Sequence, residues 1–197
     1  MFIELTDHLR CPEEHEEQYL VLIPDRIVDR SVHTGRLGCP VCRREYPVRS
    51  GVADFGPPGP PIVPGDPAQV DVSALHAFLG LAGPGGYVGL VGWPSLLAAG
   101  LMLPMPGVHF VAINPPAEVA ELPMLSLVRA PRIPLRSRTL RGIVLGGGFG
   151  SEGRWPDEAL RVVLPGLRVV GEGEAPSLRG LQVLGSGGGW WVAKRIG

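Results

Sequence analysis

Residues 37–48, LGCPVCRREYPV, constrain the possible folds of this chain more than any other stretch. Cys39 and Cys42 flank a Pro-Val pair that favours a tight turn, and an alternating, strand-like tail follows. A third cysteine, Cys11, also precedes a proline and lies far upstream. Three cysteines are an odd number, and two of them have the spacing of metal ligands, so the pattern predicts a metal site rather than disulfides.

A structural zinc ion takes four ligands, and the three thiols leave one position open. The first turn should carry its second ligand about three residues after Cys11. That position is Glu14, and His15 is next to it. An imidazole binds zinc well, so we predict His15 as the fourth ligand and keep Glu14 as the alternative, with His8 and His33 as outside candidates. The predicted structural zinc ligands are Cys11, His15, Cys39 and Cys42.

The composition narrows the function classes. The chain has 197 residues, of which 45% are hydrophobic and 19% charged, which is enough apolar material for a substantial core. A net charge of −1 argues against a broad surface that attracts nucleic acid or membranes. We find no apolar run long enough to span a membrane, and the N-terminus turns acidic where a signal peptide would be basic. A cytoplasmic location is therefore expected.

The chain divides into two compositional halves. Residues 1–56 hold all three cysteines and three of the five histidines, which predicts a small zinc-ribbon-like module. Residues 57–67 are dominated by proline and glycine and predict a stiff linker. Residues 68–197 alternate between helical and strand-like apolar segments, which predicts an α/β domain.

The second half has a readable order of elements. A helix is expected over residues 70–82 with Ser73 as its cap, and two further helices over 94–103 and 156–164. Strands are expected over residues 87–92, 108–114, 125–130, 140–147, 167–173, 181–185 and 190–195. This alternation predicts a Rossmann-like, mostly parallel sheet, closed at one edge by an antiparallel hairpin.

The first half resembles a known family. Cys39, Pro40, Cys42, Tyr46, Pro47, Val48, Gly51 and Val52 match the second half of the motif of zinc-ribbon activator subunits of tRNA and protein methyltransferases. The resemblance covers residues 3–55 and departs from the family pattern at Glu14, where the family has a cysteine. It implies a protein partner or a larger assembly.

The second half resembles the class I methyltransferases that accompany such ribbons. Segments 73–92, 132–148 and 158–173 are similar to the helix and first strand, the approach to the fourth strand, and the approach to the fifth strand of that fold. The resemblance implies that S-adenosylmethionine lies over a glycine-rich turn after the first strand, with a carboxylate at the end of the second.

The residues of that expected cofactor site depart from the family pattern. Gly92 is followed by the bulky Trp93 and by Pro94, which has no amide proton, and Asn114 stands where the carboxylate is expected. Arg141-Gly142 replaces a third expected residue, an aspartate. Gly92 and Asn114 are thus candidate cofactor-binding residues of a degenerate site. We predict that S-adenosylmethionine is not bound, and we assign no catalytic residue.

These observations predict a non-catalytic, zinc-binding protein with a degenerate methyltransferase fold that serves as a binding or scaffolding subunit. The alternative is an active S-adenosylmethionine-dependent methyltransferase that acts on RNA, protein or a small molecule. A third hypothesis is RNA binding through the most basic stretch of the second half, with arginines at positions 129, 132, 136, 138 and 141.

Overall fold

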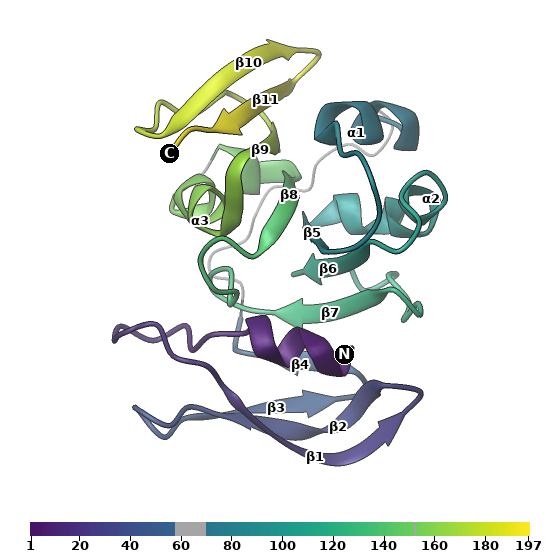
Figure 1. Ribbon diagram of the computed structural model, residues 1–197, viewed down its shortest axis with the longest axis vertical. Helices are drawn as coiled ribbons and strands as arrows, with labels where there is room; N and C mark the ends of the chain where they lie inside the picture. Colours follow the sequence, from purple (N-terminus) through teal and green to yellow (C-terminus); the bar gives the residue numbers. More distant parts are fainter. Residues whose placement is uncertain (58–69, 152) are drawn as a thin grey trace.

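The computed structural model describes residues 1–57, 70–151 and 153–197, so that most of the predicted linker at 57–67 lies outside the described residues. Eleven strands form one sheet in the order β1-β2-β3-β4-β7-β6-β5-β8-β9-β11-β10 (Figure 1). The strands are β1 (Val21–Val28), β2 (Ser31–Gly38), β3 (Glu45–Arg49), β4 (Val52–Asp54), β5 (Tyr87–Val91), β6 (His109–Ile113), β7 (Leu125–Arg129), β8 (Leu140–Leu145), β9 (Val163–Glu172), β10 (Leu181–Gly187) and β11 (Trp190–Arg195). The α-helices are α1 (Val72–Leu79), α2 (Ala98–Met102) and α3 (Trp155–Val162), and the 3-10 helices are η1 (Ile3–His8), η3 (Trp93–Leu97) and η4 (Gly147–Gly150).

The centre of the sheet is parallel. Strands β7, β6, β5, β8 and β9 pair in parallel with their neighbours, and this run follows the 3-2-1-4-5 order of a doubly wound sheet when β5 is counted as the first strand. Every residue of β6 is buried, and all but His109 are apolar, as expected for a strand that is covered on both faces. The mixed α/β class and the parallel centre agree with the prediction.

Antiparallel strands extend the sheet on both sides. At one edge, β10 and β11 form the predicted hairpin, and β11 pairs antiparallel with β9. At the other edge, β1 to β4 form an antiparallel meander built by the first half of the chain. Strand β4 then pairs in parallel with β7, which joins the cysteine-rich half to the α/β half in one sheet.

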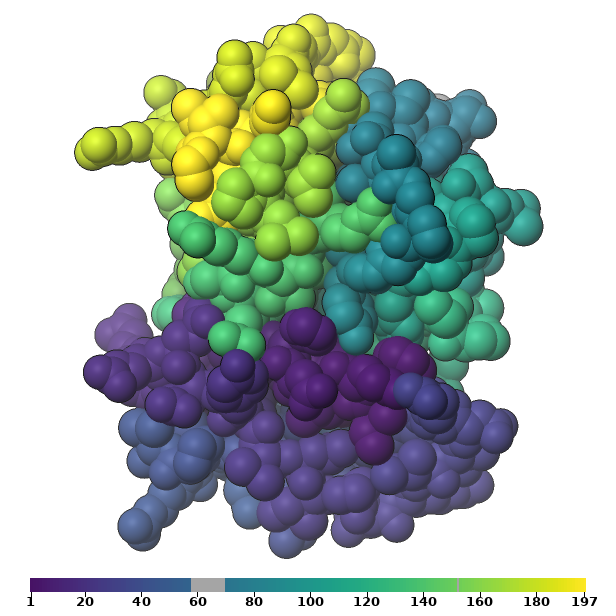
Figure 2. All heavy atoms as spheres, viewed as in Figure 1, coloured from purple at the N-terminus to yellow at the C-terminus, as the bar shows by residue number. Residues whose placement is uncertain are grey.

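Two hydrophobic cores lie on opposite faces of this sheet. Helices α1 and α2 cover one core, where Leu75 and Leu101 are fully buried. The N-terminal segment with η1 and helix α3 cover the other, where Leu5 packs in the same cluster as Val162. In Figure 2 the N-terminal residues form a purple band across the middle of the molecule, between the meander and the parallel strands.

Local differences from the predicted elements have simple causes. The predicted cap Ser73 is wrong, because the carboxylate of Asp71 accepts the amide of Ala74 and starts α1 two residues earlier. The second predicted helix begins as the 3-10 helix η3 and becomes α-helical only at Ala98. The third predicted helix, over 156–164, and the predicted strand that starts at 167 left a connection at residues 165–166. Those residues instead lie inside β9, where the pairing with β8 shifts register between Val163 and Arg168.

Within the described ranges, no helix combines the length and apolarity that a membrane crossing requires.

Candidate metal centre and ligand crevice

The two cysteine-bearing turns of the first half meet in space. The ligand atoms of Cys11, His15, Cys39 and Cys42 all lie within 4.8 Å of one another. Cys11 and His15 lie on a loop that is closed by the β-bridge between Arg10 and Tyr19. Cys39 and Cys42 lie on the turn between β2 and β3. The structure therefore brings together the four residues that the spacing singled out.

The separations inside this Cys3His group suit a tetrahedral ion. The Sγ atoms of Cys11 and Cys42 are 3.7 Å apart, and the Sγ of Cys39 is 3.4 Å from Nε2 of His15. Zinc–sulfur bonds of about 2.3 Å at tetrahedral angles give sulfur–sulfur edges of about 3.8 Å. The four ligand atoms thus lie at separations close to those around a bound zinc ion.

Neighbouring polar groups orient the ligand atoms. The Nδ1 atom of His15 lies 2.7 Å from the carbonyl oxygen of Glu16. A carbonyl only accepts hydrogen bonds, so Nδ1 is the donor, and Nε2 is the ring nitrogen left to face the cluster as a ligand atom. The hydroxyl of Tyr46 lies 3.2 Å from the Sγ of Cys11 and is buried beside it.

The thiols have different electrostatic environments. Burial raises the pKa of the Cys11 thiol to about 11. Burial also acts to raise the pKa of Cys39, but hydrogen bonds from the backbone of Cys42 and Val41 outweigh it, and the pKa of Cys39 is lowered. Binding of a metal would therefore displace protons from the cluster.

Two of the other candidate ligands, Glu14 and His8, have partners outside the cluster. Glu14 is 93% exposed and lies 3.9 Å from the guanidinium of Arg132. His8 packs edge-on against Tyr87, with 4.8 Å between the ring centroids. Of the two residues predicted as alternatives for the fourth position, His15 is the one that faces the thiols.

A second site is expected where the parallel strands change direction. From β5 the chain proceeds to β6 and β7 on one side and to β8 and β9 on the other, and ligands of open α/β sheets bind outside the carboxyl ends of the strands at such a point. The flanking loops are residues 92–94 after β5 and 146–150 after β8. In this chain the two loops pack directly against each other.

The contacts between the two loops are close. A Cβ atom added at Gly92 would lie 3.0 Å from the Phe149 ring, and one at Gly146 would overlap the ring of Pro94. The amide of Gly92 donates to the carbonyl of Ile113, 2.9 Å away. Gly92 and Gly146, whose backbone would face a ligand, are thus already covered by the Phe149 and Pro94 rings.

A carboxylate at the end of β9 ties the same loops together. One oxygen of Glu172 accepts both the indole N–H of Trp93, at 2.7 Å, and the amide of Gly147. The Trp93 ring also packs edge-on against Trp190. Sequence reasoning missed Glu172, which is the last residue of β9 and belongs to no motif.

Asn114 is held by the end of the neighbouring strand. Its side-chain amide donates to the carbonyl of Ala130 at 2.9 Å, and its oxygen accepts the Ala130 amide at 2.8 Å. Asn114 has a φ of 51°, a left-handed conformation that asparagine tolerates better than most residues. Both polar atoms of this side chain are therefore used inside the fold.

The basic stretch does not form one surface. Arg132 faces Glu14, Arg136 lies over the Tyr19 ring beside Glu17, and Arg129 is near Asp54. The guanidinium of Arg141 donates to the carbonyls of residues 82–85. Arg138 occupies a turn and has a φ of 58°.

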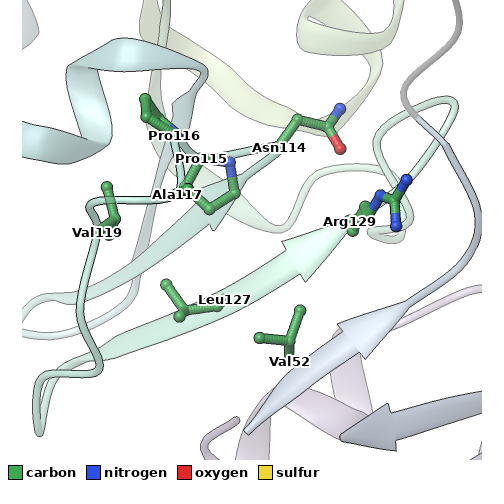
Figure 3. A pocket seen from close by; sticks show the side chains of 8 residues that line it. All are labelled: Val52, Asn114, Pro115, Pro116, Ala117, Val119, Leu127 and Arg129. Carbon is green, nitrogen blue, oxygen red and sulfur yellow. The ribbon is translucent and has the colours of Figure 1, made fainter. Parts of the chain in front are cut away.

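A pocket that the sequence did not indicate lies beside β7. Its volume is about 280 Å³, and Figure 3 shows Val119 and Pro115 on a loop that faces Leu127 and Val52 on the strands below. Asn114, Pro116, Ala117 and Arg129 complete the lining. No alternation or spacing in residues 114–119 signals a pocket, because it arises from the pairing of β4 with β7.

Comparison with known proteins gave structural neighbours only. No family model matches the chain, and no curated protein matches it. A methyltransferase from Anabaena variabilis ATCC 29413 is 15% identical over 51% of this chain and 43% of its own, with a TM-score of 0.41. A chain from the complex of the Haloferax volcanii Trm112 methyltransferase activator with a methyltransferase is 16% identical over 51% of this chain and 50% of its own, with a TM-score of 0.40.

An S-adenosylmethionine-dependent methyltransferase from Aquifex aeolicus is 16% identical over 66% of this chain and 93% of its own, with a TM-score of 0.44. The chain spans half the length or less of the first two structures. All three TM-scores are below 0.5, so the description of the fold rests on the strand order of this chain.

Proposed function

We propose that this chain is a zinc-binding, non-catalytic protein with a degenerate methyltransferase fold, and that it serves as a binding or scaffolding subunit of a larger assembly. The observation that carries the proposal is the direct packing of the loops after β5 and β8. The Phe149 ring packs against Gly92, and the Pro94 ring packs against Gly146. These two rings occupy the space that a bound nucleoside would need. S-adenosylmethionine is therefore not expected to bind.

The zinc part of the proposal rests on the chemistry of the donor set. Three thiols and an imidazole would fill a tetrahedral shell, which leaves no position for a reacting water and makes the ion structural. Such an ion would fix the two cysteine-bearing turns to each other. The chain's own contribution is to orient the ligands through Tyr46 and the Glu16 carbonyl.

The alternative is an active S-adenosylmethionine-dependent methyltransferase acting on RNA, protein or a small molecule, and the strand order favours it. It would require the two loops to separate and Asn114 to give up its bonds to Ala130. RNA binding is not part of the proposal, because the arginines of the basic stretch point to different acidic and carbonyl partners.

Titration with S-adenosylmethionine by calorimetry separates the two functions. We expect no measurable heat of binding for the wild-type protein, whereas a dissociation constant in the micromolar range would overturn the non-catalytic assignment. Elemental analysis should find one zinc per chain in the wild type and much less in Cys39→Ser. Equal zinc in both proteins would exclude the proposed ligand set.

A further inference from the structure

The pocket beside β7 exists because one connection of the parallel sheet is short. Parallel strands such as β6 and β7 are usually joined by a crossover of a dozen or more residues that includes a helix. Residues 114–124, all of which the structure describes, contain no helix and include Pro115, Pro116 and Pro123. A thin loop therefore covers a part of the sheet face that a helix would otherwise fill.

The walls of this pocket are apolar. Val52 and Leu127 form its floor on β4 and β7, and Pro115, Pro116 and Val119 form its roof (Figure 3). A volume of about 280 Å³ is just below the roughly 300–1,000 Å³ of typical ligand sites, so a compact ligand suits the pocket better than a drug-sized one.

One cationic group lies at the end of this apolar space. Arg129 lines the pocket, and its side chain is 53% exposed. Among the described residues, Asp54 is its ion-pair partner, but their nearest charged atoms are 3.8 Å apart, which is longer than a hydrogen bond. The other nearby polar side chain, Asn114, is already bonded to Ala130. The guanidinium can therefore turn its planar donors to a carboxylate.

We propose that this pocket binds a small carboxylate with an aromatic or branched aliphatic body. The apolar part would lie between the proline-rich loop and the floor, and the carboxylate would pair with Arg129. The site is separate from the metal cluster and from the loops after β5 and β8, but it shares Asn114 with the expected cofactor site, so this inference rests on the proposed non-catalytic function.

The test is a titration with 3-phenylpropionate, followed by backbone amide NMR of the full-length protein. We expect chemical-shift changes centred on residues 117–119, 127 and 129, with a dissociation constant of roughly 0.1–1 mM for a ligand of this size. The neutral analogue 3-phenylpropanamide has the same shape and should bind roughly three- to tenfold more weakly.

Three variants probe the charge and the space. Arg129→Met keeps the apolar stem but removes the charge, and should weaken binding of the carboxylate to the level of the amide. Asp54→Asn removes the competing anion while keeping an acceptor for the Gly56 amide, and should strengthen binding about two- to threefold. Val119→Trp fills the pocket and should abolish binding of both compounds.

Arg36→Met is the matched control. The Arg36 side chain has a similar exposure of 46%, and its Nε atom lies 3.3 Å from a carboxylate oxygen of Glu45. Neither residue lines the pocket. This variant should bind like the wild type. The proposal is overturned if shifts map to another region, if no shifts occur up to about 5 mM ligand, or if the carboxylate and amide bind equally. Thermal unfolding of each variant shows whether a loss of binding comes from a loss of the fold.

Discussion

His109 is the buried titratable residue whose environment is most clearly defined. It is 4% exposed, its Nε2 atom lies 2.9 Å from the hydroxyl oxygen of Ser126, and its ring stacks on Phe2 and meets the edge of Tyr87. Burial, and secondarily the positive amino group of Met1, lowers the pKa of His109 to about 4. A charged imidazole is therefore strongly disfavoured inside the fold.

This shift predicts how the free energy of unfolding depends on pH. An unfolded histidine has a pKa of about 6.5, so the unfolded chain gains a proton below that pH while folded His109 stays neutral until about pH 4. Stability should therefore fall as the pH drops through this window, by about 2 kcal/mol between pH 7 and pH 5. Urea unfolding at both pH values measures it.

His109→Gln is the control for this prediction, since glutamine can still bond Ser126 but does not titrate. Between pH 7 and pH 5, the free energy of unfolding of His109→Gln should fall by about 2 kcal/mol less than that of the wild type. Burial also lowers the pKa of His8, which remains in both proteins, so the difference between them isolates His109. Identical pH slopes for the two proteins would contradict the assignment.

At the scale of the elements, the loops after β5 and β8 fit closely against each other. Gly146 has an ordinary negative φ, so glycine is needed there for space and not for backbone conformation. The Pro94 ring and the Trp93 indole nitrogen occupy the region that a side chain would enter, the latter 2.8 Å from the added Cβ.

Gly146→Ala should therefore destabilise the protein by roughly 1–3 kcal/mol, because the two loops must move apart to admit one methyl group. Gly185→Ala in β10 is the matched control, since a Cβ there meets no atom within 4 Å, and its stability should be unchanged or slightly higher. Chemical unfolding of both variants measures the difference. A neutral effect at Gly146 would show that the loops are not closely packed in solution.

The elements also show what the sequence can and cannot predict. Strands β5, β6 and β7 were predictable because each is a short, mostly apolar run with glycine or proline within two residues of both ends. The clustering of Cys11, His15, Cys39 and Cys42 followed from their spacing on two proline-bearing turns.

Long-range contacts were not predictable in this way. Nothing in the local pattern of residues 52–54 indicates that they pair with β7. The hydrogen bonds of Glu172 to the loops after β5 and β8 likewise depend on side chains distant in sequence. The pocket beside β7 was missed for the same reason, because the absence of a helix in residues 114–124 matters only once β4 is known to lie beside β7.

At the scale of the whole molecule, the two compositional halves share one core. Leu5 and Val48 from the first half lie in the same hydrophobic cluster as Val128 and Val162 from the second. Cooperative unfolding requires this kind of shared burial. We therefore expect one thermal transition, observed at the same midpoint by circular dichroism and by tryptophan fluorescence.

Removal of metal should lower that single midpoint rather than create a second transition. If the proposed zinc contributes about 3 kcal/mol, chelation should shift the midpoint by roughly 6–12 °C for a chain of this length. The chelator should have no further effect on Cys39→Ser, which lacks a ligand. Two separate transitions after chelation would indicate that the halves unfold independently.

The parallel pairing of β4 with β7 has a practical consequence for anyone who expresses parts of this protein. A cut near residue 56 would separate β4 from β7, so each of the two fragments would lose its pairing partner. The later piece would carry a bare strand edge at β7 and would expose Leu135, which forms a bridge with Leu9 of the earlier piece. Such a fragment should self-associate, and co-production of the two pieces should restore its solubility.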